Sequence, residues 1–281
     1  MTAGDRALVS GSPGFLFAPV ASFLRNRSLI HELSKRDVLG RYRGASFGLL
    51  WSLISPFLML GVYTFAFGNV LNNRWPRPPG EQESSYAIIL FVGLICHGFF
   101  AECLSRSPLL VVGNPSYVKR VVFPLEVLPW PMIFSALFHM FMNIVVFAIL
   151  RLCVDHAFSW TIVLFPLVML PFVVLMLGIG WLLAAAGVYF RDISQITGVL
   201  STALLFTSSA IVPVNSVAEK YRMIFELNPL TFIIDQARAV ALWSQMPDWQ
   251  GLGIYLLVSL GLAYGGYAWF VATRKGFGDV I

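Results

Sequence analysis

Two ionisable residues stand four positions apart inside a long apolar stretch, where charges are costly. Glu102 and Arg106 have the spacing of helical neighbours, with the acid ahead of the base, which is the better order for an ion pair. A charge at the centre of a bilayer costs roughly 2.5–3.5 kcal/mol on insertion scales. We interpret the two as a self-neutralising pair near a membrane surface, with a gating role as the alternative.

His139 and Asn143 repeat this spacing in the next apolar run, so they share one helix face. Each can hydrogen-bond to a neighbouring helix, which contributes about 0.6–2 kcal/mol, or can line a path for a polar substrate. The spacing leaves both interpretations open. His97 stands alone in its run, and we interpret it as an interhelical hydrogen-bonding residue.

Motifs of nucleotide, metal and acyl-transfer chemistry do not occur in the sequence. We find no GxxxxGK[ST] loop for phosphates, no HExxH zinc motif and no nucleophile elbow. The three cysteines form no CxxC pair, and the four histidines are dispersed. We therefore predict a chain that is not an enzyme, with no metal site and no cofactor of its own.

A short polar segment, residues 113–124, reads GNPSYVKRVVFP between two apolar runs. An asparagine that can cap a helix and a proline at the first helical position open it, and a tyrosine and two basic residues follow. Such a helix suits docking into a groove of a cytoplasmic partner; alternatively it is a turn whose basic residues only anchor the next span. Its candidate docking residues are Asn114, Pro115, Tyr117, Lys119 and Arg120.

Aromatic residues are abundant, with 24 Phe, 9 Tyr and 8 Trp. Trp and Tyr gather at membrane surfaces by default, so most of these rings need no role beyond lipid and helix contacts. Their flat faces can also stack on the C–H faces of sugars. The aromatic candidates for lining a sugar pathway are Tyr63, Phe65, Phe67, Phe99 and Phe100.

The composition places these residues in a membrane protein. The chain is 58% hydrophobic and 12% charged, with a mean hydropathy of +0.77, whereas soluble domains carry roughly 25% charged residues. The net charge of +5 is modest and does not indicate nucleic-acid binding. No long apolar region follows Met1 closely, so no cleaved signal peptide is expected. We predict an all-α integral membrane protein.

Six apolar runs are predicted to span the membrane, because about 20 apolar residues cross a hydrocarbon core of roughly 30 Å. The fifth is short and rich in Ser and Thr. A disordered cytoplasmic tail, 1–21, and an amphipathic helix, 22–44, precede the spans, and a cytoplasmic C-terminus, 274–281, follows them. The predicted spans are 45–71, 86–112, 123–150, 160–188, 196–214 and 251–273.

The segment 22–44 is predicted to lie in the membrane interface, because apolar and charged residues divide it at a 3.6-residue period. The alternative is a helix packed on a soluble partner. Its basic residues toward the first span are Lys35, Arg36, Arg41 and Arg43. With both termini inside, 13 of the 19 Lys and Arg lie on the cytoplasmic side, which supports this orientation.

The loop between the fifth and sixth spans, residues 213–250, contains two segments that are too short to span and too apolar for a plain loop. Asn228-Pro229 divides them. We predict two short re-entrant helices at the outer face, since backbone at such depth is tolerable only where protein or a watery cavity covers it. A folded external cap is the alternative.

Five segments together carry a resemblance to a known family. They run from Arg36 to Leu60, Asn114 to Pro129, Tyr189 to Ile196, Asn228 to Leu242 and Lys275 to Ile281. The chain resembles an ABC-2 type export permease of the polysaccharide branch, which exports O-antigen, capsule or teichoic acid. One departure is Ala210, where the family commonly has proline.

The resemblance implies a homodimeric channel in the bacterial inner membrane, with two copies of a separate ATPase that bind ATP and Mg²⁺. It implies a coupling helix around 114–123, an interface helix at 22–39 and gate helices at 216–226 and 229–243. The substrate would be a lipid-linked polysaccharide, and membrane lipid would surround the channel. The outer-gate residues would be Tyr221, Phe225, Pro229 and Phe232.

Three other functions remain open from the sequence. The first is an ABC-2 permease for a small drug or lipid, and the second is an ion-coupled secondary transporter. Ion-coupled transporters usually carry inverted repeats or intramembrane carboxylates. The third is a non-transporting membrane anchor, which leaves the segment 213–250 without a role.

Overall fold

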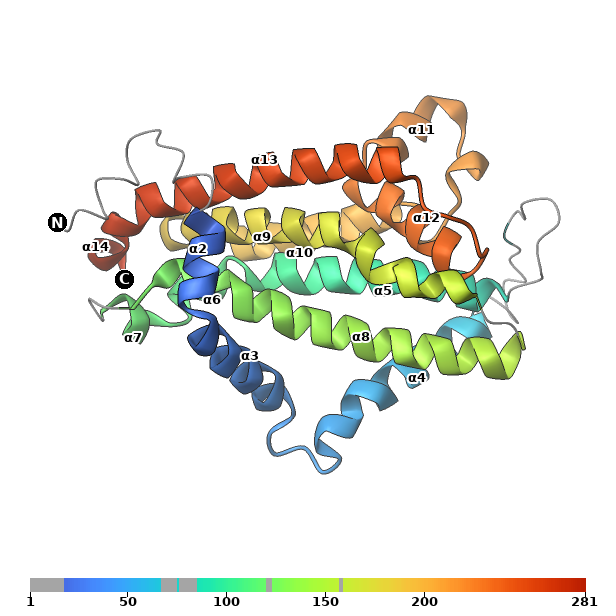
Figure 1. Cartoon of the computed structure of the whole chain (residues 1–281), viewed down its shortest axis with the longest axis horizontal. Helices are drawn as coiled ribbons and strands as arrows, with labels where there is room; N and C mark the ends of the chain where they lie inside the picture. The colour runs from blue at the N-terminus through green and yellow to red at the C-terminus, as the bar shows by residue number, and fades with distance from the viewer. Residues whose placement is uncertain (1–17, 67–74, 76–84, 120–122, 157–158) are drawn as a thin grey trace.

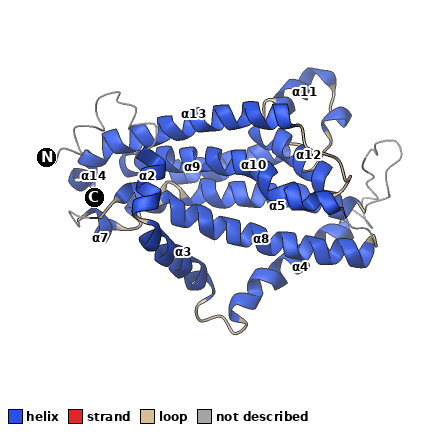
Figure 2. Ribbon diagram, viewed as in Figure 1, coloured by secondary structure: helices blue, strands red, loops and turns tan. Residues whose placement is uncertain are grey.

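The computed structural model describes residues 18–66, 75, 85–119, 123–156 and 159–281. Within these ranges the chain folds into helices and turns without a strand, as Figure 2 shows, so the all-α prediction is confirmed for this part. The helices are α2 (Ala18–Arg25), α3 (Arg27–Tyr42), α4 (Trp51–Tyr63), α5 (Tyr86–Arg106), α6 (Leu109–Val112), α7 (Pro115–Val118), α8 (Pro129–Val154), α9 (Phe165–Tyr189), α10 (Ile193–Phe206), α11 (Glu219–Glu226), α12 (Pro229–Ala241), α13 (Trp249–Thr273) and α14 (Phe277–Val280). Short 3₁₀ turns are η1 (Gly48–Leu50), η3 (Leu125–Val127), η4 (Trp160–Leu164), η5 (Val214–Ser216) and η6 (Arg274–Gly276).

The long helices form a bundle along the longest axis of the molecule (Figure 1). α9 packs closely against α13, and α5 packs against both α8 and α10. The helices α2, α7 and α14 lie at one end of the bundle, which we call the α7 end. The helices α11 and α12 lie toward the opposite end, the α11 end. Figure 1 also shows α3 and α4 forming a V beside the bundle.

Among the residues that the structure describes, five helical stretches are long and apolar enough to cross a membrane. The second predicted span was placed at 86–112, but its helix ends at Arg106. Pro108 has no N–H to bond to a carbonyl one turn back, so the chain turns there and continues as α6. The five stretches are Gly48–Ala66, Tyr86–Arg106, Leu125–Cys153, Trp160–Tyr189 and Trp249–Val280.

The fifth predicted span, 196–214, is not a membrane-length helix. α10 has 14 residues, which at 1.5 Å per residue cover about 21 Å. It ends because the side-chain amide of Asn228 donates to the carbonyl of Leu204 at 2.9 Å. A continuing helix would bond that carbonyl to the N–H of Ser208.

The predicted amphipathic helix 22–44 is two helices, and its start was placed too late. Helical structure begins at Ala18, within the tail predicted as disordered; residues 1–17 lie outside the described residues. The helix is interrupted at Asn26, whose side-chain amide donates to the carbonyl of Ser22 at 2.8 Å. Such local side-chain bonds compete with the helical backbone.

Small residues allow α9 and α13 to approach closely. A Cβ built on Gly266 would lie 2.2 Å from the carbonyl oxygen of Gly178, and one on Gly178 would lie 2.7 Å from the Cα of Ala263. Small residues at a seam let helix backbones approach in membrane proteins. Next to this seam Trp181 is fully buried, and its indole N–H donates to the carbonyl of Glu126 at 2.8 Å.

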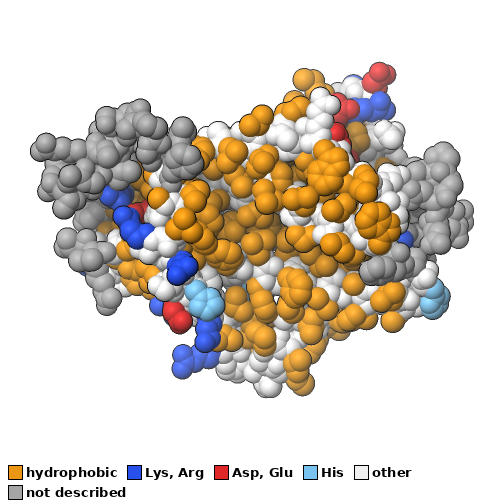
Figure 3. Space-filling view, in the orientation of Figure 1, with side chains coloured by type: hydrophobic (Ala, Val, Ile, Leu, Met, Phe, Trp, Pro, Cys, Tyr) orange, Lys and Arg blue, Asp and Glu red, His pale blue; other side chains and the backbone are white. Residues whose placement is uncertain are grey.

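The outer surface has the distribution expected of a membrane protein. Figure 3 shows hydrophobic side chains across the middle of the visible face, while charged side chains gather toward its ends and along its lower edge near α3. Exposed large hydrophobics include Val163 at 77% and Leu257 at 71% of their full exposure. In water such a surface would drive association; in a bilayer it faces lipid or a second protein.

The α9–α13 seam predicts a sharp difference between two adjacent glycines. Gly266→Ala should destabilise the bundle by about 1–3 kcal/mol, because the added methyl group meets the Gly178 backbone rather than a side chain that can move. Thermal unfolding of the detergent-solubilised protein measures the loss. The matched control is Gly265→Ala, whose Cβ has no atom within 4 Å. Equal unfolding midpoints for the two variants would contradict the packing described.

Candidate functional site

A cavity of about 520 Å³ lies between α4, α5 and α8 and reaches the last residues of α3. Four of the predicted pathway residues meet there, although they come from three helices: Tyr63, Phe99, His139 and Asn143. Other polar or aromatic lining residues are Arg41, Tyr42, Trp51, Ser52, Ser55, Phe91, His97 and Glu102. The wall therefore combines aromatic faces with hydrogen-bonding groups.

The other predicted aromatic residues lie elsewhere. Phe100 is 2% exposed and stacks on Phe172, with ring centroids 6.2 Å apart, so it belongs to the core and does not line the cavity. Phe99 and Phe100 are neighbours on a helix that is apolar all round, which is why the sequence did not separate their roles. Phe65 is 64% exposed and borders a second hollow of about 310 Å³ toward the α11 end of α4. Phe67 lies outside the described residues.

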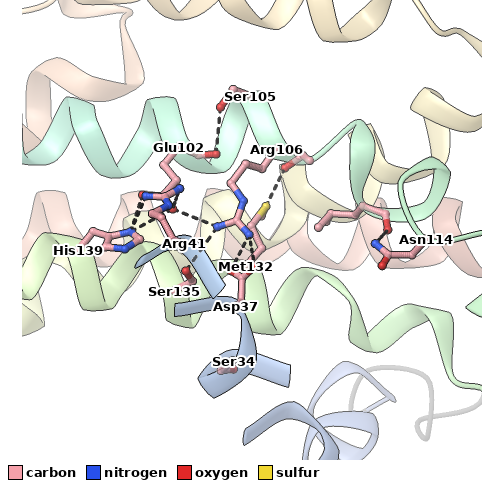
Figure 4. A network of polar contacts seen from close by, with 12 residues as sticks. Ser34, Asp37, Arg41, Glu102, Ser105, Arg106, Asn114, Met132, Ser135 and His139 are labelled. Carbon is pink, nitrogen blue, oxygen red and sulfur yellow. Dashed lines mark hydrogen bonds and ion pairs between the residues drawn. The ribbon is translucent and has the colours of Figure 1, made fainter. Parts of the chain in front are cut away.

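The carboxylate of Glu102 joins three helices at the α7 end of the cavity (Figure 4). It accepts from Arg106 at 3.0 Å, as the i, i+4 spacing predicted. It also accepts from Arg41 of α3 at 2.9 Å and lies 2.9 Å from Nδ1 of His139 on α8. Arg106 in turn donates to both oxygens of Asp37 on α3. The hydroxyl of Ser135 on α8 accepts from Arg106 at 3.5 Å. The pair is therefore part of a cluster that also includes two residues of α3 and two of α8.

The other polar residues of these spans make simpler contacts. The amide of Asn143 donates to the carbonyl of His139 at 2.8 Å, within its own helix. Nε2 of His97 lies 3.1 Å from the carbonyl of Ser201 on α10 and 3.3 Å from its hydroxyl. The interhelical role predicted for His97 is therefore observed, and His139 makes an interhelical contact while also lining the cavity.

The predicted docking helix is α7, a single turn. Asn114 precedes it but does not cap it, because its side-chain amide donates backward to the carbonyl of Leu110 at 3.0 Å. Pro115 occupies the first turn as expected. The ring of Tyr117 stacks on Phe123, with centroids 4.3 Å apart. Lys119 follows the helix directly, and Arg120 lies outside the described residues.

One contact connects α7 with α3. The Arg36 guanidinium donates to the hydroxyl of Tyr117 at 2.7 Å and lies over its ring. Among the other basic residues of α3, Arg41 reaches the Glu102 cluster, while Lys35 is exposed and Arg43 is exposed just beyond the helix. The sequence grouped these four by charge, and the structure separates them by contact.

The two predicted gate helices differ in how they are attached. α11 has no buried residue, and Tyr221, Met223 and Leu227 are at least half exposed. α12, in contrast, has nine buried residues and packs against α5 and α9. Phe232 stacks on Tyr255 of α13, and the Tyr255 hydroxyl donates to the carbonyl of Pro229. Phe225 on α11 is partly exposed.

Arg238 on α12 is fully buried, which the sequence did not predict. Its guanidinium donates to three carbonyls, those of Ile89 at 3.1 Å, Ser209 at 2.6 Å and Ala210 at 2.8 Å. The ring of Trp75 covers it, 4.2 Å from centroid to guanidinium carbon. Its position within the apolar run FIIDQARAVAL is the signal in the sequence that it is buried.

Both ends of α12 are held by side-chain hydrogen bonds. At its start, the Asn228 side chain caps the helix by accepting from the Leu230 N–H at 2.9 Å. Near its end, the Thr161 hydroxyl donates to the carbonyl of Val240, and Arg151 donates to the carbonyl of Leu242 at 3.0 Å. The last carbonyls of a helix need such partners. α12 is therefore a fixed part of the bundle.

Comparison with known proteins places these features in a family. A family model described as "ABC-2 type transporter" matches residues 28–242. An O-antigen export system permease of Myxococcus xanthus is 25% identical over 93% of this chain and 98% of its own length. A second such permease, from Klebsiella pneumoniae, is 23% identical over 90% of this chain and 95% of its own length. A polysialic acid transport protein of Escherichia coli is 21% identical over 81% of this chain and 84% of its own length.

Replacing Arg238 tests how much its three carbonyl contacts contribute to the stability of the protein. Arg238→Met keeps much of the volume but leaves three buried acceptors without their donor, so stability should fall by about 3 kcal/mol or more. Lys220→Met on exposed α11 is the control and should stay within about 0.5 kcal/mol of the parent. Both are measured by thermal unfolding in detergent. A stable Arg238→Met protein would show that α12 is held by packing alone.

Proposed function

Because the chain belongs to the ABC-2 type transporter family, we propose that it is the channel-forming subunit of an exporter that moves a lipid-linked polysaccharide across the bacterial inner membrane. It is a membrane subunit, not an enzyme, and a separate ATPase drives it. The match over most of its length to O-antigen and polysialic acid permeases supports a polysaccharide over a small drug or lipid. The family match sets the ion-coupled transporter aside.

The cavity beside α4 is the observation that carries the proposal. Its volume of about 520 Å³ lies within the range of ligand sites, roughly 300–1,000 Å³. Tyr63 provides a ring face for sugars, while Asn143 and Ser55 provide groups that hydrogen-bond hydroxyls. This combination suits a sliding chain of sugars, because each contact is weak and each successive sugar ring can make a similar contact.

A second copy of the chain would complete the pathway. Only 11% of the most apolar window of Gly48–Ala66 is buried, against 72% for Tyr86–Arg106, so α4 presents most of its surface to another partner. A two-fold axis beside α4 would bring two cavities face to face and enclose one channel. In this arrangement α4 walls the pathway.

The α7 end is proposed to face the cytoplasm. It carries α7 with Lys119, and the partner ATPases, which bind ATP and Mg²⁺, would dock there. Both ends of the chain would then be cytoplasmic, in line with the excess of Lys and Arg on that side. α10 with residues 207–214 would form the sixth crossing, although only its first part is helical.

α11 is the movable part of the proposed outer gate. It is amphipathic and exposed, whereas α12 is fixed at both ends and at Arg238. Tyr221 and Phe225 on α11 would move with the gate, while Pro229 and Phe232 on α12 would form its fixed edge. The re-entrant geometry of the two helices belongs to this proposal.

Blocking the cavity tests the pathway. Ser55→Trp places a large ring in the cavity and should lower the amount of polysaccharide on the cell surface by about tenfold or more, while the protein still assembles with its ATPase. The control is Leu257→Trp on the outer face of α13, which is 71% exposed. Surface polysaccharide is measured in cells that lack the chromosomal copy. Unchanged export by Ser55→Trp would place the pathway elsewhere.

Removing the basic pair after α7 tests the coupling surface. Lys119→Ala with Arg120→Ala should reduce export about tenfold, since each 1.4 kcal/mol of docking free energy is worth that factor. The ATPase activity of the purified complex should also lose its dependence on the membrane subunit. Arg27→Ala, an exposed arginine on α3, serves as the control. Normal export by the double variant would remove this segment from the coupling surface.

A further inference from the structure

The Glu102 cluster separates two hollows. The cavity of about 520 Å³ reaches Arg41 and Glu102 on one side, and a smaller hollow of about 120 Å³ includes Asp37 and Arg106 on the other. Asp37 and Arg41 are one turn apart on α3, as Glu102 and Arg106 are on α5. The partition is therefore about one helical turn thick, roughly 5 Å. The smaller hollow also reaches Tyr117 of α7.

The part of α3 that forms this partition is held by polar contacts. In the first half of α3, Ile30 and Leu33 are buried, but no residue from 34 to 42 is. That second half contacts the bundle through Arg36, Asp37 and Arg41, and through the ring of Tyr42 beside His139. Ion pairs between partly exposed groups are weak compared with a buried apolar face.

The linker after α3 is built to bend. Gly44 has a φ of +87° and Gly48 a φ of +48°, conformations that glycine adopts without strain. A Cβ at either position would have no atom within 4 Å, so this linker is not packed against the bundle. This linker therefore does not fix the second half of α3 relative to α4.

Charge balance allows the partition to separate cleanly. Glu102 and Arg106 are an i, i+4 pair on α5, and Asp37 and Arg41 have the same spacing and order on α3. In the observed state Glu102 pairs with Arg41 as well as with Arg106, and Arg106 also pairs with Asp37. If α3 moves away, each helix keeps one acid and one base at the better spacing for an ion pair. Neither side is left with an uncompensated charge.

We propose that this cluster is an inner gate, and that the second half of α3 is its moving part. The inference rests on the proposed function and adds the regulation of the same cavity. Motion of α7 under the partner ATPase is transmitted through Tyr117 to Arg36, and α3 swings from α8. Arg41 leaves Glu102 and His139, the two hollows join, and the sugar chain enters from the α7 end.

Access of a charged thiol reagent to the cavity tests the gate. Asn143→Cys lies one turn beyond His139, and it is introduced in a Cys153→Ser background, because Cys96 and Cys103 are fully buried. Inside-out vesicles carrying the complex with its ATPase, without nucleotide, are treated with sulfonatoethyl methanethiosulfonate. Arg41→Ala should raise the labelling rate about tenfold, the effect of losing one charge-assisted hydrogen bond.

Two controls separate the gate from general loosening of α3. Arg41→Lys keeps the charge and should restore slow labelling, and Arg27→Ala, on the buried half of the same helix, should label like the parent. Equal rates for the parent and Arg41→Ala, with both complexes intact by size exclusion, would overturn the inner gate. Rapid labelling of the parent would overturn it as well.

The labelling readout is independent of what the protein exports. If the substrate is not a polysaccharide, surface polysaccharide will not respond to Ser55→Trp, while Arg41→Ala still accelerates labelling; that result supports the gate and rejects the proposed substrate. A different result would support the pathway and reject the gate. In that case Ser55→Trp abolishes export, but Arg41→Ala leaves the labelling rate unchanged.

Discussion

A single carboxylate, that of Glu102, sets the position of the helices around the cavity. It lies where the bundle meets α3, is largely shielded from solvent, and has cationic partners from α3 and α5 together with His139 of α8. An unpaired charge there would be costly, and Arg106 of the same helix keeps Glu102 paired, while Arg41 and His139 connect it to α3 and α8. The cavity wall, the angle of α3 and the contact between α3 and α7 all follow from this arrangement.

The two ends of the bundle satisfy their polar groups in different ways. At the α7 end, side chains pair with side chains, and these contacts can exchange partners without leaving a buried charge. At the α11 end, Arg238 and Asn228 bind backbone carbonyls, which have no alternative partner within the hydrocarbon. The first kind of contact suits a moving element and the second a fixed one. This difference explains why α12 is rigidly placed while α3 and α11 are lightly attached.

The sequence predicted what depends on local patterns and missed what depends on distant contacts. Apolar length located Trp160–Tyr189 within a residue or two, and the i, i+4 spacing found the pair of Glu102 and Arg106. The end of α10 could not be predicted, because it depends on Asn228, 24 residues beyond Leu204. Asp37 is 69 residues from Arg106, so no local pattern connects them. Phe99 and Phe100 were inseparable because they are adjacent aromatic residues in the same apolar run.

The location of charge in the cavity wall bears on where the energy for transport enters. The charged residues of the described lining are Arg41 and Glu102, and both lie at the rim toward α7. An ion-coupled transporter concentrates its titratable groups near the bilayer midplane, where protonation or ion binding changes the pathway itself. Here the deeper wall, toward Asn143 and Tyr63, offers aromatic and uncharged polar groups that let a sugar chain slide. The charged groups are placed instead between the cavity and α7, where motion of an external ATPase reaches them first. The partition between the two hollows is thus the part of the cavity wall that lies nearest to α7.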